Sequence, residues 1–497
     1  MNKTLKTISL ILTITSIIIY SLFSYNLMKL KIFPHIIRTS LLLLIAAILL
    51  VSIWIIKSNK HNSKSVKIIS IVLMAFLIFG QITFVVYASK TTKTIEEINN
   101  KDNKSFNEMS LLVSSDSKIN SIEEVGNQKI ATAESFDTIS VKKAIEEYKN
   151  TYNINLATTD LTNYQKAYRS ILNGKNKVML LNESYRPVLE EAYPDFSKKT
   201  KIIGSVTIEN DSEVKDKNNI VMENKPFNIY LSGIDTYGSL STVSRSDVNM
   251  ILSVNPSKNT ILITTIPRDT YVFIGGDETK SDKLTHAGLF GVDSSIKSIE
   301  KLLDIEIDYY GKVNFTSLTD LIDVLGEIKV YNPTAFESSF TDYFFPEGEI
   351  EMDGEMALAY SRERYNLDEG DFDRSRNHSR VLTGIIKKLL SYEMLINFNK
   401  VSDIALESIN TDIPSSKLID LANRQLSLGE SWKIKSQYLK GEGSADYTSY
   451  LMPDVSLYMM IPDEDSIKKV HDKIIENNKV ELKSKDTYLF DSKFAAN

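Results

Sequence analysis

The chain has 497 residues but no cysteine and only five histidines, which removes several kinds of chemistry at once. Without cysteine there is no disulfide and no thiolate nucleophile, and a zinc site would depend on histidine and carboxylate ligands. A basic excess is also missing, because the net charge is −6. Nucleic-acid binders usually carry a basic domain or stripe, so we expect no nucleic-acid partner.

Arginine is scarce, and its placement is informative. It accounts for 11 of the 58 basic residues, and seven of those 11 lie between positions 245 and 380. Arginine is preferred to lysine where a planar group binds phosphate or carboxylate through two hydrogen bonds. Aspartates accompany these arginines, at Asp235, Asp247, Asp269, Asp371 and Asp373. The mixture indicates a phosphate substrate bound together with a divalent metal.

Three long apolar stretches open the chain, at about residues 7–27, 36–56 and 68–88. Each approaches the ~20 residues that cross a bilayer core. None contains an acidic residue, and three in series are typical of a membrane anchor rather than of a removable signal peptide. We therefore expect three transmembrane helices.

The lysines around these stretches predict an orientation. Six of them lie before the first stretch and between the second and third, at Lys3, Lys6, Lys57, Lys60, Lys64 and Lys67. The loop on the other side carries only Lys29, Lys31 and Arg38. By the positive-inside rule the six-lysine side is cytoplasmic, which places the chain after about residue 89 outside the cell. Because that compartment has no ATP supply, a phosphate substrate there is expected to be carried by a lipid.

The pattern of polar and apolar residues divides the chain into four parts. We predict a membrane anchor (1–88), a stalk (89–106), a small α/β accessory domain (107–222) and a larger layered α/β domain (226–475) with a central mixed sheet. The accessory domain shows no phosphate loop, metal-ligand spacing or nucleophile pattern. We interpret it as a spacer or protein-interaction module, with a ligand site as the alternative.

Three charged patches of the larger domain follow predicted strands or begin predicted helices, where such folds place their ligands. The patches are 244–247 with Asp235 before it, 267–269 with Lys283 and His286 after it, and 361–364 with 371–374 and His378 after it. Taken alone, His286 is better interpreted as a hydrogen-bonded structural residue than as a base.

A helix is expected to begin at Arg374 or Ser375 and to carry Arg376, His378 and Arg380 in its first turns. The N-terminus of a helix has partial positive charge, so basic residues there are unfavourable unless an anion lies among them. Arg374 and His378 are four residues apart and share a face. The pattern predicts an anion at this helix start.

Five segments resemble, in order and spacing, the motifs of the LytR–CpsA–Psr family. They are SRSDVNMILSVNP, TTIPRDTYV, DKLTHAG, DGEMALAYSRER and GDFDRSRNH. The likeness covers about residues 226–390 and extends to about 475, and the three spans with an accessory domain resemble the capsule-type (CpsA-like) branch of Gram-positive bacteria. It implies a Mg²⁺-dependent (or Mn²⁺-dependent) phosphotransferase. Such enzymes attach an undecaprenyl-pyrophosphate-linked glycopolymer, of capsular or teichoic-acid type, to peptidoglycan, with the lipid tail in an apolar tunnel.

The resemblance also implies residue roles. Asp235 and Asp247 would hold the metal, and the catalytic candidates are Asp247, Arg268 and Asp371, with either aspartate as the general base. Pyrophosphate binding would fall to Arg245, Arg268, Lys283, Arg362, Arg364, Arg374 and His378. The family commonly has Arg-Gln where this chain has Asn377-His378, so either Arg376 takes over that contact or the head group sits differently.

A second hypothesis is a non-enzymatic regulator of capsule synthesis or export that binds polyprenyl pyrophosphate. It needs a signal on the cytoplasmic side, where the predicted loops 1–6 and 57–67 are too short for a signalling domain. A transcription regulator is disfavoured by the acidic charge and by the absence of a helix-turn-helix pattern.

Overall fold

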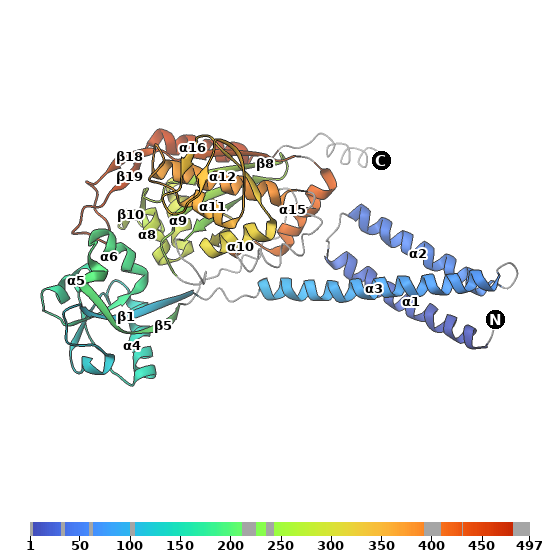
Figure 1. Cartoon of the computed structure of the whole chain (residues 1–497), viewed down its shortest axis with the longest axis horizontal. Helices are drawn as coiled ribbons and strands as arrows, with labels where there is room; N and C mark the ends of the chain where they lie inside the picture. Colours follow the sequence, from blue (N-terminus) through green and yellow to red (C-terminus); the bar gives the residue numbers. More distant parts are fainter. Residues whose placement is uncertain are drawn as a thin grey trace, which may run out of the picture. The chain divides into compact units, whose positions relative to one another are not determined.

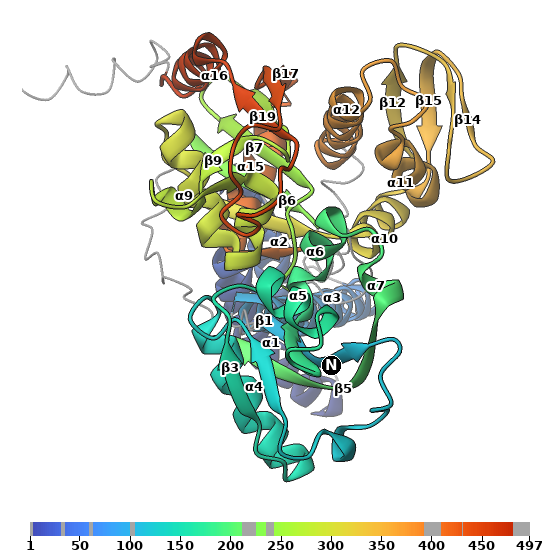
Figure 2. The same cartoon turned by 90° about the vertical axis from the view of Figure 1, so that its left-hand side faces the viewer.

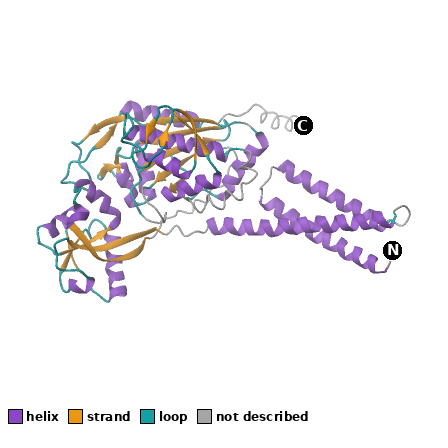
Figure 3. Ribbon diagram, in the orientation of Figure 1, coloured by secondary structure: helices purple, strands orange, loops and turns teal. Residues whose placement is uncertain are grey.

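The computed structural model describes residues 3–30, 35–58, 63–99, 105–210, 225–234, 243–391, 409–429 and 431–480. They form two compact units. One contains the N-terminal helices together with α15 (Ser415–Leu428), and the other contains both α/β domains. Figure 3 shows the contrast between the all-helical N-terminal part and the mixed helices and strands that follow.

Three apolar helices open the chain, as expected: α1 (Lys3–Leu30), α2 (His35–Lys57) and α3 (Lys64–Asn99), drawn in blue in Figure 1. Each contains a segment long and apolar enough to cross a membrane, at Ser9–Met28, Ile37–Lys57 and Ser65–Val86. The prediction of a multi-pass membrane protein is confirmed. Helix α3 continues past its apolar segment to Asn99, so the first part of the predicted stalk is helical.

The accessory domain is a five-stranded sheet with helices on both faces. Its strand order is β3-β2-β4-β1-β5, in which β1 is antiparallel to β4 and β5, and β2 is parallel to β3 and β4. The strands are β1 (Ser105–Ser114), β2 (Lys129–Thr132), β3 (Ala157–Asp160), β4 (Val178–Asn182) and β5 (Thr200–Asn210). The helices are α4 (Thr138–Tyr152), α5 (Tyr164–Leu172), α6 (Arg186–Ala192) and α7 (Phe196–Lys199).

The larger domain is built on a six-stranded mixed sheet of order β16-β11-β6-β7-β8-β17, as predicted. Strands β6, β7 and β8 form an antiparallel meander, and β11 and β17 pair in parallel with its two edges. The strands are β6 (Phe227–Gly233), β7 (Val248–Asn255), β8 (Thr260–Ile266), β11 (Tyr309–Val313), β16 (Asn410–Thr411) and β17 (Lys433–Tyr438). Their apolar residues pack against α9 (Val292–Leu303) and α16 (Glu464–Asn477) in one core.

Shorter elements complete this domain. Two-stranded sheets pair β9 (Tyr271–Phe273) with β10 (Ser281–Lys283), β12 (Ile328–Asn332) with β15 (Gly348–Met352), β13 (Phe336–Glu337) with β14 (Phe344–Phe345), and β18 (Gly441–Ser444) with β19 (Met459–Pro462). The further helices are α8 (Leu284–Ala287), α10 (Phe315–Leu325), α11 (Gly354–Arg362) and α12 (Asp371–Leu389). Figure 2 shows β12, β15 and α11 side by side, and the Phe345 ring of β14 packs on Tyr360 of α11.

Helix α12 begins three residues earlier than predicted. Its first turn therefore contains Asp371 and Asp373, which suit the partial positive charge of a helix N-terminus. The argument that this helix start needs an anion to offset its basic residues was wrong, because the two aspartates already provide negative charge there. The arginines that follow are explained instead by their individual contacts, described below.

The two α/β domains share one hydrophobic core. Tyr168, Val188 and Leu189 of the accessory domain belong to the same buried cluster as Leu289 and Leu457 of the larger domain. Val188 and Leu189 lie on α6, so this helix is held by the shared core. The accessory domain is thus packed against the larger domain rather than tethered to it.

We predict that Leu189→Ala destabilises both domains together. Removing a fully buried leucine side chain lowers the free energy of unfolding by about 2–5 kcal/mol, and the shared core passes that loss to both sides. Thermal unfolding of the detergent-solubilised chain should show one transition at a lower temperature. Ile139→Ala, on an exposed position of α4, is the matched control and should change little. Two separate transitions would contradict the prediction.

Candidate active site

Three segments that are far apart in sequence meet beside the ends of β6 and β8, and backbone hydrogen bonds fix their positions. The Asp247 N–H donates to the Gly233 carbonyl at the end of β6 (2.8 Å). The Ser246 N–H donates to the Thr285 carbonyl (3.2 Å), and the Thr285 N–H donates to the Arg268 carbonyl (2.9 Å). The segments that carry Asp247, Arg268 and Thr285 are therefore joined directly through their main chains.

Gly288 allows this close approach. A Cβ atom at this position would lie 2.8 Å from the Ser244 carbonyl oxygen and 2.9 Å from the Ser246 nitrogen. Both are backbone atoms, which cannot move aside as a flexible side chain can. Glycine at 288 is thus needed for the 244–246 segment to pack on α8.

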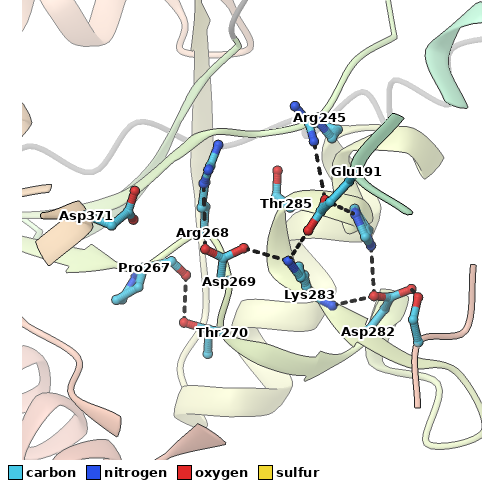
Figure 4. Close-up of polar contacts among 12 residues, drawn as sticks. Glu191, Arg245, Pro267, Arg268, Asp269, Thr270, Asp282, Lys283, Thr285 and Asp371 are labelled. Atoms are coloured by element: carbon cyan, nitrogen blue, oxygen red, sulfur yellow. Dashed lines mark hydrogen bonds and ion pairs between the residues drawn. The ribbon is translucent and has the colours of Figure 1, made fainter. Parts of the chain in front are cut away.

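Three of the predicted arginines gather around Asp247, and we call Arg245, Arg268 and Arg374 the arginine clamp. Oδ1 of Asp247 accepts hydrogen bonds from Arg268 Nη1 (3.2 Å) and from the Thr285 hydroxyl (3.1 Å). Arg374 pairs with Asp371, three residues before it on α12. In Figure 4 the Arg268 side chain lies between Asp371 and Thr285. The hydroxyl of Thr285 is the one that donates to Asp247.

The arginine clamp controls the charge of Asp247. Burial alone would raise the pKa of this carboxyl, but Arg245, Arg268 and Arg374 outweigh burial and hold the pKa below its ordinary value. Burial would lower the pKa of Arg268, yet Asp247, Asp269 and Asp371 raise it further above its ordinary value. Burial lowers the pKa of Arg374, and Arg268 repels its charge. Asp247 is therefore ionised near neutral pH, in a setting built for negative charge.

Lys283 lies at one end of the clamp and is almost fully enclosed, with 3% of its side chain exposed. Its Nζ is 3.1 Å from Asp269 Oδ1 and 2.5 Å from Oε1 of Glu191, a residue of α6 in the accessory domain (Figure 4). The other Glu191 oxygen lies 3.7 Å from Arg245 Nη1. Glu191 thus reaches the clamp from outside the larger domain, which nothing in the sequence pattern signals.

His286 is held as a structural residue, as the sequence suggested. Its Nδ1 donates to Oδ1 of Asp282 (2.8 Å), and both side chains are fully buried. Oδ2 of Asp282 accepts hydrogen bonds from the Ser449 hydroxyl (2.7 Å) and the Leu451 N–H (2.9 Å). This pair ties the Lys283 segment to the segment around residue 450.

Arg362 and Arg364, also predicted to bind pyrophosphate, make a different kind of contact. The Arg362 guanidinium lies over two rings, 4.8 Å from the Phe315 centroid and 5.1 Å from that of Phe340. Arg364 stacks on Tyr365 at 4.8 Å. Cation–π contacts of this kind hold a guanidinium in place without cancelling its charge. The structure therefore places these two arginines against aromatic rings, and the charge of Arg364 also acts on Arg374 of the clamp.

Glu363, between them, was not identified from the sequence. It is fully buried and accepts hydrogen bonds from Ser339 and from the N–H groups of Tyr365 and Asn366. A carboxylate with this many donors fixes the 363–366 loop. Arg376 pairs with Asp373 (2.6 Å) and with Glu369 (2.5 Å), so both of its terminal nitrogens are engaged by carboxylates in this structure.

His378 lies near the clamp on α12. Exclusion of its ring from water, together with the charges of Arg374 and Arg268, lowers the pKa of His378 to about 3. The imidazole is therefore neutral near neutral pH and adds no positive charge to the arginine clamp.

Asp247 is a candidate ligand for a hard divalent cation through one of its carboxylate oxygens. Mg²⁺ commonly binds through one or two carboxylates, with waters and substrate phosphates completing its shell. The two hydrogen bonds that the Asp247 carboxylate accepts among the described residues both go to Oδ1, which leaves Oδ2 available. The described part of the chain contains no cluster of three His, Asp or Glu residues suited to a metal, and Asp235, the other predicted ligand, lies outside it.

These observations define a membrane-anchored α/β protein with a cluster of arginines and carboxylates at the ends of its central strands. The model of the LytR_cpsA_psr family matches residues 192–475, more than half of the chain. The chain therefore belongs to the LytR–CpsA–Psr family. A second family model, DNA polymerase processivity factor, matches residues 63–181, a stretch that begins beside the third apolar helix and ends in β4.

Several relatives have an assigned activity. The polyisoprenyl-teichoic acid–peptidoglycan teichoic acid transferase TagU of Enterococcus faecalis is 34% identical over 248 residues, which is 49% of this chain and 80% of the relative. TagU of Bacillus subtilis is 33% identical over 234 residues, 47% of this chain and 74% of the relative. The crystal structure of B. subtilis TagV, at 29% identity, covers 52% of this chain and 100% of its own, with a TM-score of 0.45. The TagU relatives are transferases, and thus enzymes.

We predict that His378→Gln reduces the loss of stability in acid. The unfolded chain takes up a proton at an ordinary histidine pKa near ~6.5, whereas the folded chain does so only near 3. Protonation therefore favours the unfolded state, and stability falls as the pH drops from about 6.5 towards 3. Urea midpoints measured between pH 7 and 4 should fall less for the glutamine variant than for the wild type. Parallel curves would show that His378 is not held neutral.

Proposed function

We propose that this protein is a Mg²⁺-dependent phosphotransferase that attaches a polyprenyl-pyrophosphate-linked glycopolymer to peptidoglycan outside the cell. The glycopolymer would be of capsular or teichoic-acid type. The observation that carries the proposal is the arginine clamp around an ionised Asp247, since a buried site with three guanidiniums and oxygen donors suits a pyrophosphate with a bound cation. The names of the TagU relatives support the same class of substrate.

The transfer would take place by attack of an acceptor hydroxyl on the glycan-side phosphorus. A new P–O bond forms to the acceptor, the bridging P–O bond breaks, and polyprenyl phosphate leaves with the electron pair. Such reactions depend mainly on positioning and on charge neutralisation at the transferred group. The clamp arginines would bind the phosphate oxygens, and Asp247, with Asp235 as a second ligand, would hold the metal, which neutralises further charge.

The hydroxyl proton needs an acceptor, and Asp371 suits this role better than Asp247. Asp247 already accepts two hydrogen bonds on Oδ1, and its lowered pKa makes it a weak base. Asp371 pairs with Arg374 through Oδ1, and no hydrogen bond to its Oδ2 is found among the described residues, which leaves that oxygen to accept the proton. Asp371→Asn should therefore lower kcat more than it weakens donor binding.

Arg268→Ala should lower transferase activity by about 100-fold or more, the usual effect of removing one buried donor to a transition state. Mass spectrometry of the full chain in nanodiscs, given a polyprenyl-pyrophosphoryl glycan and a peptidoglycan oligomer, would detect the phosphodiester product. Asp247→Asn and EDTA should abolish it as well.

Arg376→Gln is the matched control for that experiment. Like Arg268→Ala, this substitution removes one guanidinium. Arg376 lies on α12 and pairs with Glu369 and Asp373, so the variant should keep most of its activity. Donor binding without product, under conditions in which a TagU relative forms product, would support the non-enzymatic regulator instead.

A further inference from the structure

The accessory domain contributes a charged side chain to the anion site. Glu191 is the sixth residue of α6, and its carboxylate lies between Lys283 Nζ (2.5 Å) and Arg245 Nη1 (3.7 Å). Glu191 therefore belongs to the accessory domain, although it sits against two cations of the larger domain (Figure 4).

The position of Glu191 is fixed. Val188 and Leu189 of α6 are buried in the core that the accessory domain shares with Leu289, Leu451 and other residues of the larger domain. This packing fixes the backbone of α6 beside Lys283, and the ion pairs to Lys283 and Arg245 orient the Glu191 carboxylate. Glu191 is thus built into the wall of the site.

Glu191 balances the charge of the site. Four cations, Arg245, Arg268, Lys283 and Arg374, are joined by ion pairs to four carboxylates, Glu191, Asp247, Asp269 and Asp371. Lys283 has two of these carboxylates as partners and almost no exposed surface. A phosphate oxygen that binds Lys283 or Arg245 has to share that cation with the Glu191 carboxylate.

We propose, resting on the proposed function, that Glu191 is a specificity-determining residue whose carboxylate competes with phosphate for Lys283 and Arg245. The site then favours a pyrophosphate diester, with one charge on each phosphorus, over a pyrophosphate with a terminal phosphate. A terminal phosphate has a second pKa near ~6 and carries up to one more charge at neutral pH. The accessory domain thereby helps the enzyme to select the glycan-loaded lipid over the unloaded polyprenyl pyrophosphate.

Binding to the full chain in nanodiscs tests this. The probes are farnesyl pyrophosphate and farnesyl-pyrophosphoryl-N-acetylglucosamine, titrated by calorimetry at pH 7.5 in one Mg²⁺ buffer. The wild type should bind the diester more tightly. Glu191→Gln should bind both probes more tightly, by about three- to tenfold for the diester, and should gain about threefold more for farnesyl pyrophosphate, because the more highly charged ligand gains more from the loss of one negative charge.

Two further variants make the outcome specific. Glu190→Gln makes the same charge change at the adjacent position, whose carboxylate contacts Ser197, and it should bind like the wild type. Lys283→Met added to Glu191→Gln should remove much of the gain if Glu191 acts through Lys283. Thermal unfolding of each variant shows whether it is folded.

Several outcomes would overturn the inference. Glu191→Gln binding both probes as the wild type does would show that its charge does not reach the ligand. Weaker binding of both probes by the folded variant would show that Glu191 holds the clamp together instead of competing. If the wild type binds neither probe, or if Arg268→Ala binds as tightly as the wild type, the proposed function itself fails.

Discussion

The arrangement of this site depends on one electrostatic constraint, an ionised carboxylate enclosed by three guanidiniums. Asp247 could not stay charged in its buried position without Arg245, Arg268 and Arg374, and these cations would repel one another without carboxylates between them. The fold meets this constraint through main-chain hydrogen bonds that join the strand ends, and through Gly288, which lets two backbones approach. The side chains are therefore placed before any ligand arrives.

Much of this could be predicted from the sequence. The three apolar helices, the mixed sheet and the grouping of Arg245, Arg268 and Arg374 with Asp247 follow from apolar periodicity and from motifs at strand ends. Such signals are local in sequence, so they can be recognised without coordinates. The start of α12 was misplaced because its two aspartates were interpreted as part of a charged patch before the helix rather than as its first turn.

Other features depended on contacts between distant segments. No local pattern shows that Arg362 would lie between Phe315 and Phe340, or that Glu363 would be buried as an acceptor for its own loop. Glu191 is the clearest case. It is separated from Lys283 by 92 positions and belongs to a domain in which no motif was recognisable. The accessory domain was interpreted as a spacer or interaction module, and its packing against the site became visible only in three dimensions.

The core shared by the two α/β domains requires apolar residues at particular positions of the larger domain. Leu289, Leu451, Met452 and Leu457 are buried in the cluster to which α5 and α6 of the accessory domain also contribute. A relative that lacks such a preceding domain would expose the same positions to water, where contiguous apolar surface favours aggregation. The polarity of these four positions in a homologous chain would therefore reveal whether its catalytic domain has evolved alone or with a companion domain packed against it.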